Sequence, residues 1–124
     1  MPRGTKNGWV VIKPALIRFS HGIVCIVLHV VFVMVLGFNV YFCGTEEFLT
    51  YGNLFTRMFF CYIAMTGQRF MYYTPWCISD ASQIASGLAY NAKDKDAWNK
   101  IVNVKIIELE TSTTCIEMIR HWNH

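Results

Sequence analysis

The run from Ile23 to Phe42 constrains the fold of this chain most strongly, because it contains no Asp, Glu, Lys or Arg. A helix of about 20 residues rises about 30 Å, which is the thickness of the hydrocarbon core of a bilayer. The apolar core of a signal peptide is shorter, and no small-residue cleavage site follows this run. We therefore predict a transmembrane helix over residues 23–42, in which His29 faces a neighbouring helix rather than performing chemistry.

The charges on either side of this run predict its orientation. Residues 1–22 form a basic N-terminal flank, whereas the loop after the run carries Glu46 and Glu47 and no basic residue before Gly52. Because cytoplasmic flanks are enriched in Lys and Arg, we expect the basic flank in the cytoplasm and the acidic loop in a lumen. The same argument accounts for the net charge of +3 without a nucleic acid partner, since no block of Lys or Arg accompanies it.

Composition and cysteine spacing exclude several classes of protein. With 54% hydrophobic and 15% charged residues, the 124-residue chain is less polar than a soluble domain and has room for one domain at most. Its cysteines show no CxxC or Cys/His spacing typical of zinc, so we predict no metal site and expect buried, unreactive thiols. The five cysteines are Cys25, Cys43, Cys61, Cys77 and Cys115.

Two further segments have membrane-like length. A second span is predicted over residues 54–71, with Arg57 and Arg69 near its ends. Residues 72–90 contain Pro75, several polar residues and one carboxylate, Asp80. Because an ionisable group is costly in lipid, we expect this segment to be a chamber-lining or re-entrant helix. An interfacial helix with the carboxylate in solvent is the alternative.

The remaining segment, 91–124, is predicted to be a surface loop, an extended segment and the start of a helix. Apolar and polar residues alternate from Val102 to Ile106 and again from Ile107 to Glu110, and a period of two is typical of extended backbone. Thr114 and Glu117 have the spacing of a capping box, which begins a helix. The predicted fold is therefore an all-α, multi-span membrane protein with two or three membrane helices.

Several motifs in the second half of the chain carry a family resemblance. In order and spacing they are similar to the central part of the membrane-bound O-acyltransferases, in the lysophospholipid acyltransferase branch, and the similarity covers about residues 50–124. The motifs are RFMYYTPW at 69–76, SGLAYN at 86–91, Trp98-Asn99, Asn103-Val104, Glu110-Thr111 and Trp122-Asn123.

The sequence also departs from the family pattern. Ala89 and Ala92 stand where glycines are common, and Asn99 stands where aspartate is commoner. Family members are several times longer, and their near-invariant histidine lies in a Trp-His-Gly-like segment beyond the end of this sequence. The resemblance thus implies a partial chain of one acyltransferase domain, which we expect to be inactive alone.

The resemblance implies transfer of an acyl group from acyl-coenzyme A to the free hydroxyl of a lysophospholipid, in the endoplasmic reticulum membrane. Acyl-coenzyme A would be a co-substrate, and no bound cofactor is expected. Asn123 matches the family's asparagine, which is proposed to orient reactants or to stabilise developing charge. The residues expected to bind substrate or to line the chamber are Arg69, Tyr73, Trp76, Asp80 and Trp98.

Two alternatives accompany this interpretation. His121 and His124 lack the spacing of the family histidine, so we do not expect either to be the base, and Arg69 could instead form a structural ion pair with Asp80. The chain could also be a small, non-catalytic membrane interaction protein, such as a truncated isoform that binds partner helices.

Overall fold

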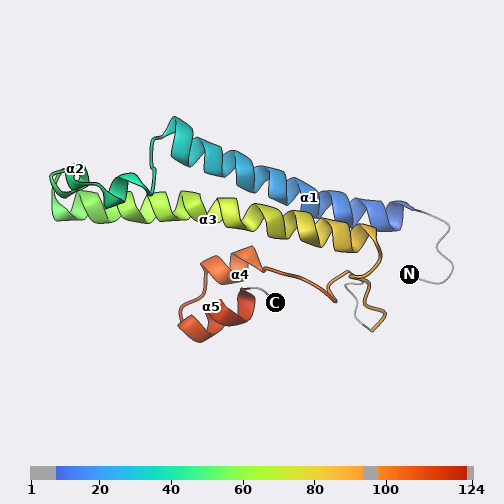
Figure 1. The fold of residues 1–124 in the computed structure, drawn as a ribbon. Helices are drawn as coiled ribbons and strands as arrows, with labels where there is room; N and C mark the ends of the chain where they lie inside the picture. The colour runs from blue at the N-terminus through green and yellow to red at the C-terminus, as the bar shows by residue number, and fades with distance from the viewer. Residues whose placement is uncertain (1–7, 94–97, 123–124) are drawn as a thin grey trace. The chain divides into compact units, whose positions relative to one another are not determined.

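The computed structural model describes residues 8–93 and 98–122, and these are helical apart from turns, loops and one isolated bridge (Figure 1). This confirms the predicted all-α class. The chain divides into two compact units: Met1–Gly22 with Tyr73–His124, and Ile23–Tyr72. The elements are α1 (Trp9–Val30), the π-helical turn η1 (Val31–Val35), the 3-10 turn η2 (Phe42–Gly44), α2 (Glu46–Leu49), α3 (Leu54–Ala85), α4 (Ile106–Glu110) and α5 (Cys115–His121).

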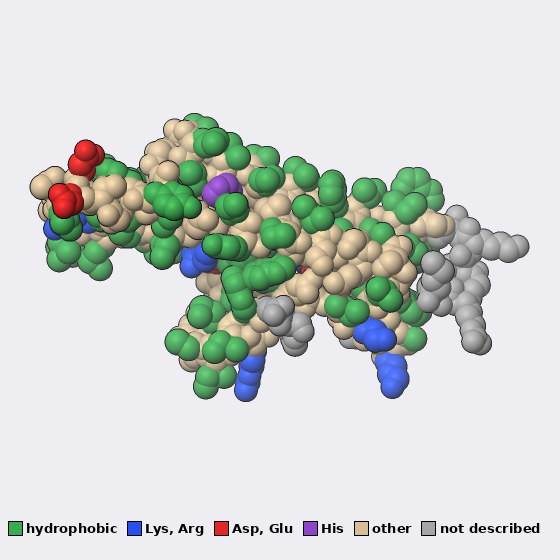
Figure 2. All heavy atoms as spheres, viewed as in Figure 1, with side chains coloured by type: hydrophobic (Ala, Val, Ile, Leu, Met, Phe, Trp, Pro, Cys, Tyr) green, Lys and Arg blue, Asp and Glu red, His purple; other side chains and the backbone are tan. Residues whose placement is uncertain are grey.

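Among the described residues, the continuous helix Trp9–Val35 is the single one that is long and apolar enough to cross a membrane. Hydrophobic side chains cover much of its visible surface (Figure 2). The helix begins earlier than the predicted span 23–42 and also ends earlier. It ends where Gly37 takes a φ of 73° and the amide of Phe38 donates to the carbonyl of Phe32. A glycine in the left-handed region is a common helix stop, so residues 37–41 continue as a loop before η2.

The predicted segments 54–71 and 72–90 share one continuous helix, α3. Asn53 begins it, because its side chain accepts a hydrogen bond from the amide of Thr56 at 2.8 Å. The helix continues through Pro75 and ends before Gly87, which has a φ of 79°. A proline removes one helical hydrogen bond but does not have to end a helix that tertiary contacts support.

The unit Ile23–Tyr72 has an aromatic core. Phe48, Phe60 and Ala64 are its buried centre, and Phe38 and Phe42 pack against them. The ring centroids of Phe42 and Phe60 are 5.5 Å apart, within the range of favourable aromatic pairs.

In the same unit His29 lies 2.9 Å from the carbonyl oxygen of Gly67 through its Nδ1. Gly67 lies on α3, so this contact confirms the prediction that His29 faces a neighbouring helix.

In the other unit, α4 and α5 form a small helical pair (Figure 1). The predicted capping box is confirmed, since the amide of Glu117 donates to the Thr114 hydroxyl at 3.2 Å. The Glu117 carboxylate reaches back to the amide of Thr113 rather than to that of Thr114. The predicted extended backbone is wrong over Ile106–Glu110, which is α4, because Leu109 turns inward and is buried there.

Candidate functional site

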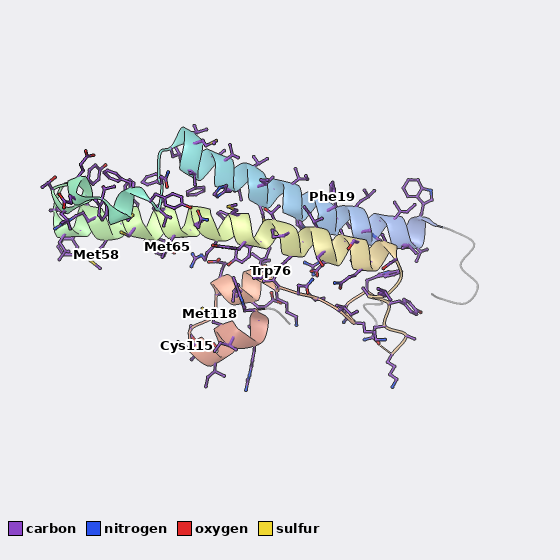
Figure 3. The ribbon with its side chains drawn as sticks, in the orientation of Figure 1. Phe19, Met58, Met65, Trp76, Cys115 and Met118 are labelled. Atoms are coloured by element: carbon purple, nitrogen blue, oxygen red, sulfur yellow. The ribbon has the colours of Figure 1, made fainter. Side chains whose placement is uncertain are left out.

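Three side chains of α3 contact the segment that runs from Asn103 to Trp122. Their positions, 73, 76 and 80, are three and four residues apart, which places them on one face of a helix. Figure 3 shows Trp76 on the side of α3 that faces α4 and α5. We call this group of contacts the α3 seam, and it consists of Tyr73, Trp76 and Asp80 with Asn103, Glu110 and Trp122.

Tyr73 anchors the first contact of the α3 seam. Its side chain is fully buried, and its hydroxyl donates a hydrogen bond to a carboxylate oxygen of Glu110. A buried tyrosine hydroxyl requires such a partner, and a charged acceptor makes a stronger bond than a neutral one. Glu110 is the last residue of α4, so this bond ties that short helix to α3.

Asp80 makes the polar contact at the other end of the seam. It is only 1% exposed, and its Oδ1 accepts from the amide of Asn103 at 3.0 Å and from its Nδ2 at 2.7 Å. The Oδ2 atom is buried and has no hydrogen-bond partner among the described residues. Because an ionised carboxylate in an apolar interior is costly, each donor that it has is structurally important.

The middle of α1 also approaches this end of the seam. An added Cβ at Gly22 would lie 3.2 Å from a side-chain carbon of Ile78, so the two backbones are close together there. Arg18, one turn earlier, exerts an electrostatic attraction on Asp80. The environment of Asp80 therefore offers one hydrogen-bonded oxygen, one unused oxygen and a nearby positive charge.

Trp122 forms the aromatic end of the seam. Its ring packs edge-on against Trp76, with centroids 4.4 Å apart, and lies 6.3 Å from Tyr73. Its backbone pairs with Val104 in an isolated antiparallel bridge. Asn123, the predicted catalytic residue, lies outside the described residues. The residue before it, Trp122, packs against Trp76 and Tyr73, which were predicted to line the chamber.

The other predicted site residues lie elsewhere. Arg69 belongs to the unit Ile23–Tyr72, where its guanidinium donates to the Thr66 hydroxyl at 3.0 Å. Trp98 packs against Tyr90 with centroids 5.5 Å apart. The suggested ion pair of Arg69 with Asp80 would join the two units, so it stays a prediction.

Asn103 and Glu110 were not predicted as site residues, although both stand in motifs of the family resemblance. The sequence signal that could have identified them is complementary hydrogen bonding. A buried aspartate needs hydrogen-bond donors, and a buried tyrosine hydroxyl needs an acceptor. Over residues 8–93 and 98–122, no group of three or more His, Cys, Asp or Glu side chains could hold a metal ion.

Comparison with known proteins finds similarity to three acyltransferases, each over part of its length. The chain is 29% identical over 90 residues to the membrane-bound glycerophospholipid O-acyltransferase 1 of Mus musculus, covering 70% of this chain and 18% of that protein. It is 33% identical over 87 residues to the lysophospholipid acyltransferase of Saccharomyces cerevisiae, covering 67% and 14%. It is 31% identical over 81 residues to the lysophospholipid acyltransferase 6 of Drosophila melanogaster, covering 63% and 11%. No family model and no solved structure matches the chain.

Most of the chain is therefore similar in sequence to membrane-bound acyltransferases. More particularly, the similarity is to their lysophospholipid acyltransferase branch, which confirms the resemblance recognised in the motifs. The similarity is partial, since the chain spans less than a fifth of the length of each of these three relatives.

Proposed function

We propose that this chain forms part of the acyl-transfer site of a lysophospholipid acyltransferase. The observation that carries the proposal is the α3 seam, where a buried acid and aromatic side chains hold the segment that leads into Asn123. The names of the relatives supply the reaction class. In this proposal the acyl donor is acyl-coenzyme A, and the acceptor is the free hydroxyl of a lysophospholipid.

The chemistry assigns different tasks to different parts of the site. A hydroxyl is a poor nucleophile near neutral pH, so a general base must accept its proton while the new ester bond forms and the thioester bond breaks. The family resemblance assigns the base to a histidine outside this sequence. Asn123 would donate its amide hydrogens to the oxyanion that develops on the acyl carbonyl.

The α3 seam would give Asn123 its position. Trp122 packs on Trp76, and the segment that begins at Asn103 is held by the carboxylate of Asp80. Catalytic groups act only when they are held close to the productive geometry, so these contacts would matter for turnover more than for substrate binding. In this role Trp76 and Asp80 are positioning residues.

The membrane arrangement is part of the proposal. The relatives include proteins named as membrane-bound, and the helix Trp9–Val35 can cross a bilayer. We propose a multi-pass protein of the endoplasmic reticulum, in which α3 lines the chamber and partner helices complete its wall. The lysophospholipid would then enter from the bilayer itself.

A chimera tests this proposal. Residues 50–124 replace the matching segment of the yeast lysophospholipid acyltransferase, and acyl transfer from acyl-coenzyme A to lysophospholipid is measured in microsomes. The chimera is expected to retain activity, and Asn123→Ala is expected to lower kcat by about 100-fold or more with little change in KM. Ser112→Ala, at a half-buried position of the same segment whose hydroxyl bonds to the carbonyl of Glu108, is the matched control.

Two results would refute the assignment. One is a chimera that reaches the membrane in normal amount but transfers no acyl group. The other is an Asn123→Ala chimera with unchanged kcat. The first outcome would favour the non-catalytic membrane interaction protein, and the second would remove Asn123 from the acyl-transfer site.

A further inference from the structure

Two cysteines that are 18 residues apart in the sequence meet in the unit Ile23–Tyr72. Cys43 lies in η2 and Cys61 lies on α3; both pack against one buried core, and the Cys61 thiol is close enough to Cys43 to raise its pKa. We propose that Cys43 and Cys61 are a dithiol site that closes into an intramolecular disulfide on exposure to a small-molecule disulfide. This inference is independent of the proposed acyl transfer.

The neighbouring aromatic residues hold the two cysteines in place. Phe42 precedes Cys43 and Phe60 precedes Cys61, and their ring centroids are 5.5 Å apart. Both cysteines pack against the core formed by Phe48, Phe60 and Ala64. A disulfide needs its two α-carbons within about 7 Å. The ring contact between Phe42 and Phe60 brings together the two segments that carry the cysteines.

Access to the pair comes through Cys61. Its side chain lines an open surface groove of about 470 Å³ together with Arg57 and Met58. Met58 and Met65 mark the stretch of α3 that carries it (Figure 3). Burial and the adjacent Cys61 thiol raise the pKa of Cys43 to about 11, so Cys43 is protonated at neutral pH. Because Cys61 lines the groove, it is the thiol that a disulfide in solution reaches first.

The reaction balances with oxidised glutathione as the oxidant. The Cys61 thiolate attacks one sulfur of glutathione disulfide, the S–S bond breaks, and one glutathione leaves as a thiolate. Cys43 then loses its proton and attacks the Cys61 sulfur, which releases the second glutathione. In total, two protein thiols are oxidised and one glutathione disulfide is reduced to two glutathione molecules.

The acidic loop that contains Glu46 and Glu47 indicates the compartment in which the dithiol site lies. This loop was predicted to face a lumen, and lumenal compartments of the secretory pathway favour disulfides. A closed Cys43–Cys61 bond would fasten η2 and its aromatic cluster to α3. The other three cysteines lie outside this core: Cys25 on α1, Cys77 further along α3 and Cys115 on α5.

Peptide mapping of the full chain in detergent micelles tests the site. The protein is incubated with oxidised glutathione at about pH 8, where thiolate is present, then alkylated and digested with trypsin. Trypsin cuts after Arg18, Arg57 and Arg69, so Cys43 lies in peptide 19–57 and Cys61 lies in peptide 58–69. We expect the two peptides joined by one disulfide, with the alkyl label on Cys25.

Variants identify the sulfur atoms. Cys25→Ser and Cys115→Ser are expected to retain the joined peptides, and Cys43→Ser is expected to lose them and to carry glutathione on Cys61. The mapping of the unaltered chain does not depend on how well any variant folds. Unlinked peptides, a link through Cys25, or a stable glutathione adduct on Cys61 of the unaltered chain would each overturn the proposal.

Discussion

The hydrogen bonds from Asn103 to Asp80 allow a local test of the α3 seam. In Asp80→Ala both bonds are lost, and the backbone amide of Asn103 is left without its acceptor. A hydrogen bond to a charged group contributes about 1.5–3 kcal/mol, so the amide should exchange its hydrogen about 10- to 150-fold faster. Asp80→Asn keeps an acceptor oxygen, and its effect should be smaller.

Hydrogen exchange followed by mass spectrometry measures this directly. The peptic peptide that contains Asn103 is compared among the unaltered chain, Asp80→Ala and Ser82→Ala. Ser82 lies on the same helix but is exposed, and its hydroxyl bonds within the helix to the carbonyl of Ser79. Equal exchange at Asn103 in Asp80→Ala and Ser82→Ala would refute the claim that the carboxylate holds this segment.

Four further outcomes are expected. An added Cβ at Gly67 would lie 2.8 Å from the Cβ of Phe32, so Gly67→Ala should destabilise the chain by about 1–3 kcal/mol in thermal unfolding. Gly44→Ala should be tolerated, because nothing lies within 4 Å of its added Cβ. Thr114→Ala should cost about 1 kcal/mol of α5 stability, seen as faster amide exchange in that helix. Hydrogen bonding, chiefly from the Thr113 amide, lowers the pKa of Glu117 below its ordinary value of 4.5. The Glu117 carboxylate therefore stabilises this turn fully above about pH 4.5, and its contribution is lost as the pH falls through the lower folded-state pKa, which a carbon-13 titration of the carboxyl group would follow.

Features decided by local chemistry were predictable from the sequence. The capping box at Thr114 and Glu117 needs only two side chains at the right spacing, and the structure has it. His29 in an apolar run needs a polar partner, and the carbonyl of Gly67 lies within hydrogen-bond distance. The long apolar helix followed from hydropathy alone, although its ends did not.

Features decided by tertiary contacts were not predictable in the same way. Hydropathy marked residues 1–22 as a flank, yet the helix already begins at Trp9 and includes Pro14. The alternation over 102–110 indicated a strand, but a strand needs a partner to pair with. The described chain supplies one bridge, Val104 with Trp122, and then turns into α4.

The sequence contains the hydrogen-bond donors and acceptors of the α3 seam, but it does not indicate which donor pairs with which acceptor. Tyr73 and Asp80 are a donor and an acceptor that burial leaves in need of partners, and Glu110 and Asn103 have the complementary chemistry. Composition alone would equally allow Asp80 to pair with an arginine. The register of α3 determines which residues pair. It places Tyr73 beside α4, and it places Asp80 two helical turns later, next to the backbone amide of Asn103. The two groups of family motifs, at 69–76 and from 98 onward, are therefore joined by hydrogen bonds and ring contacts rather than by sequence distance.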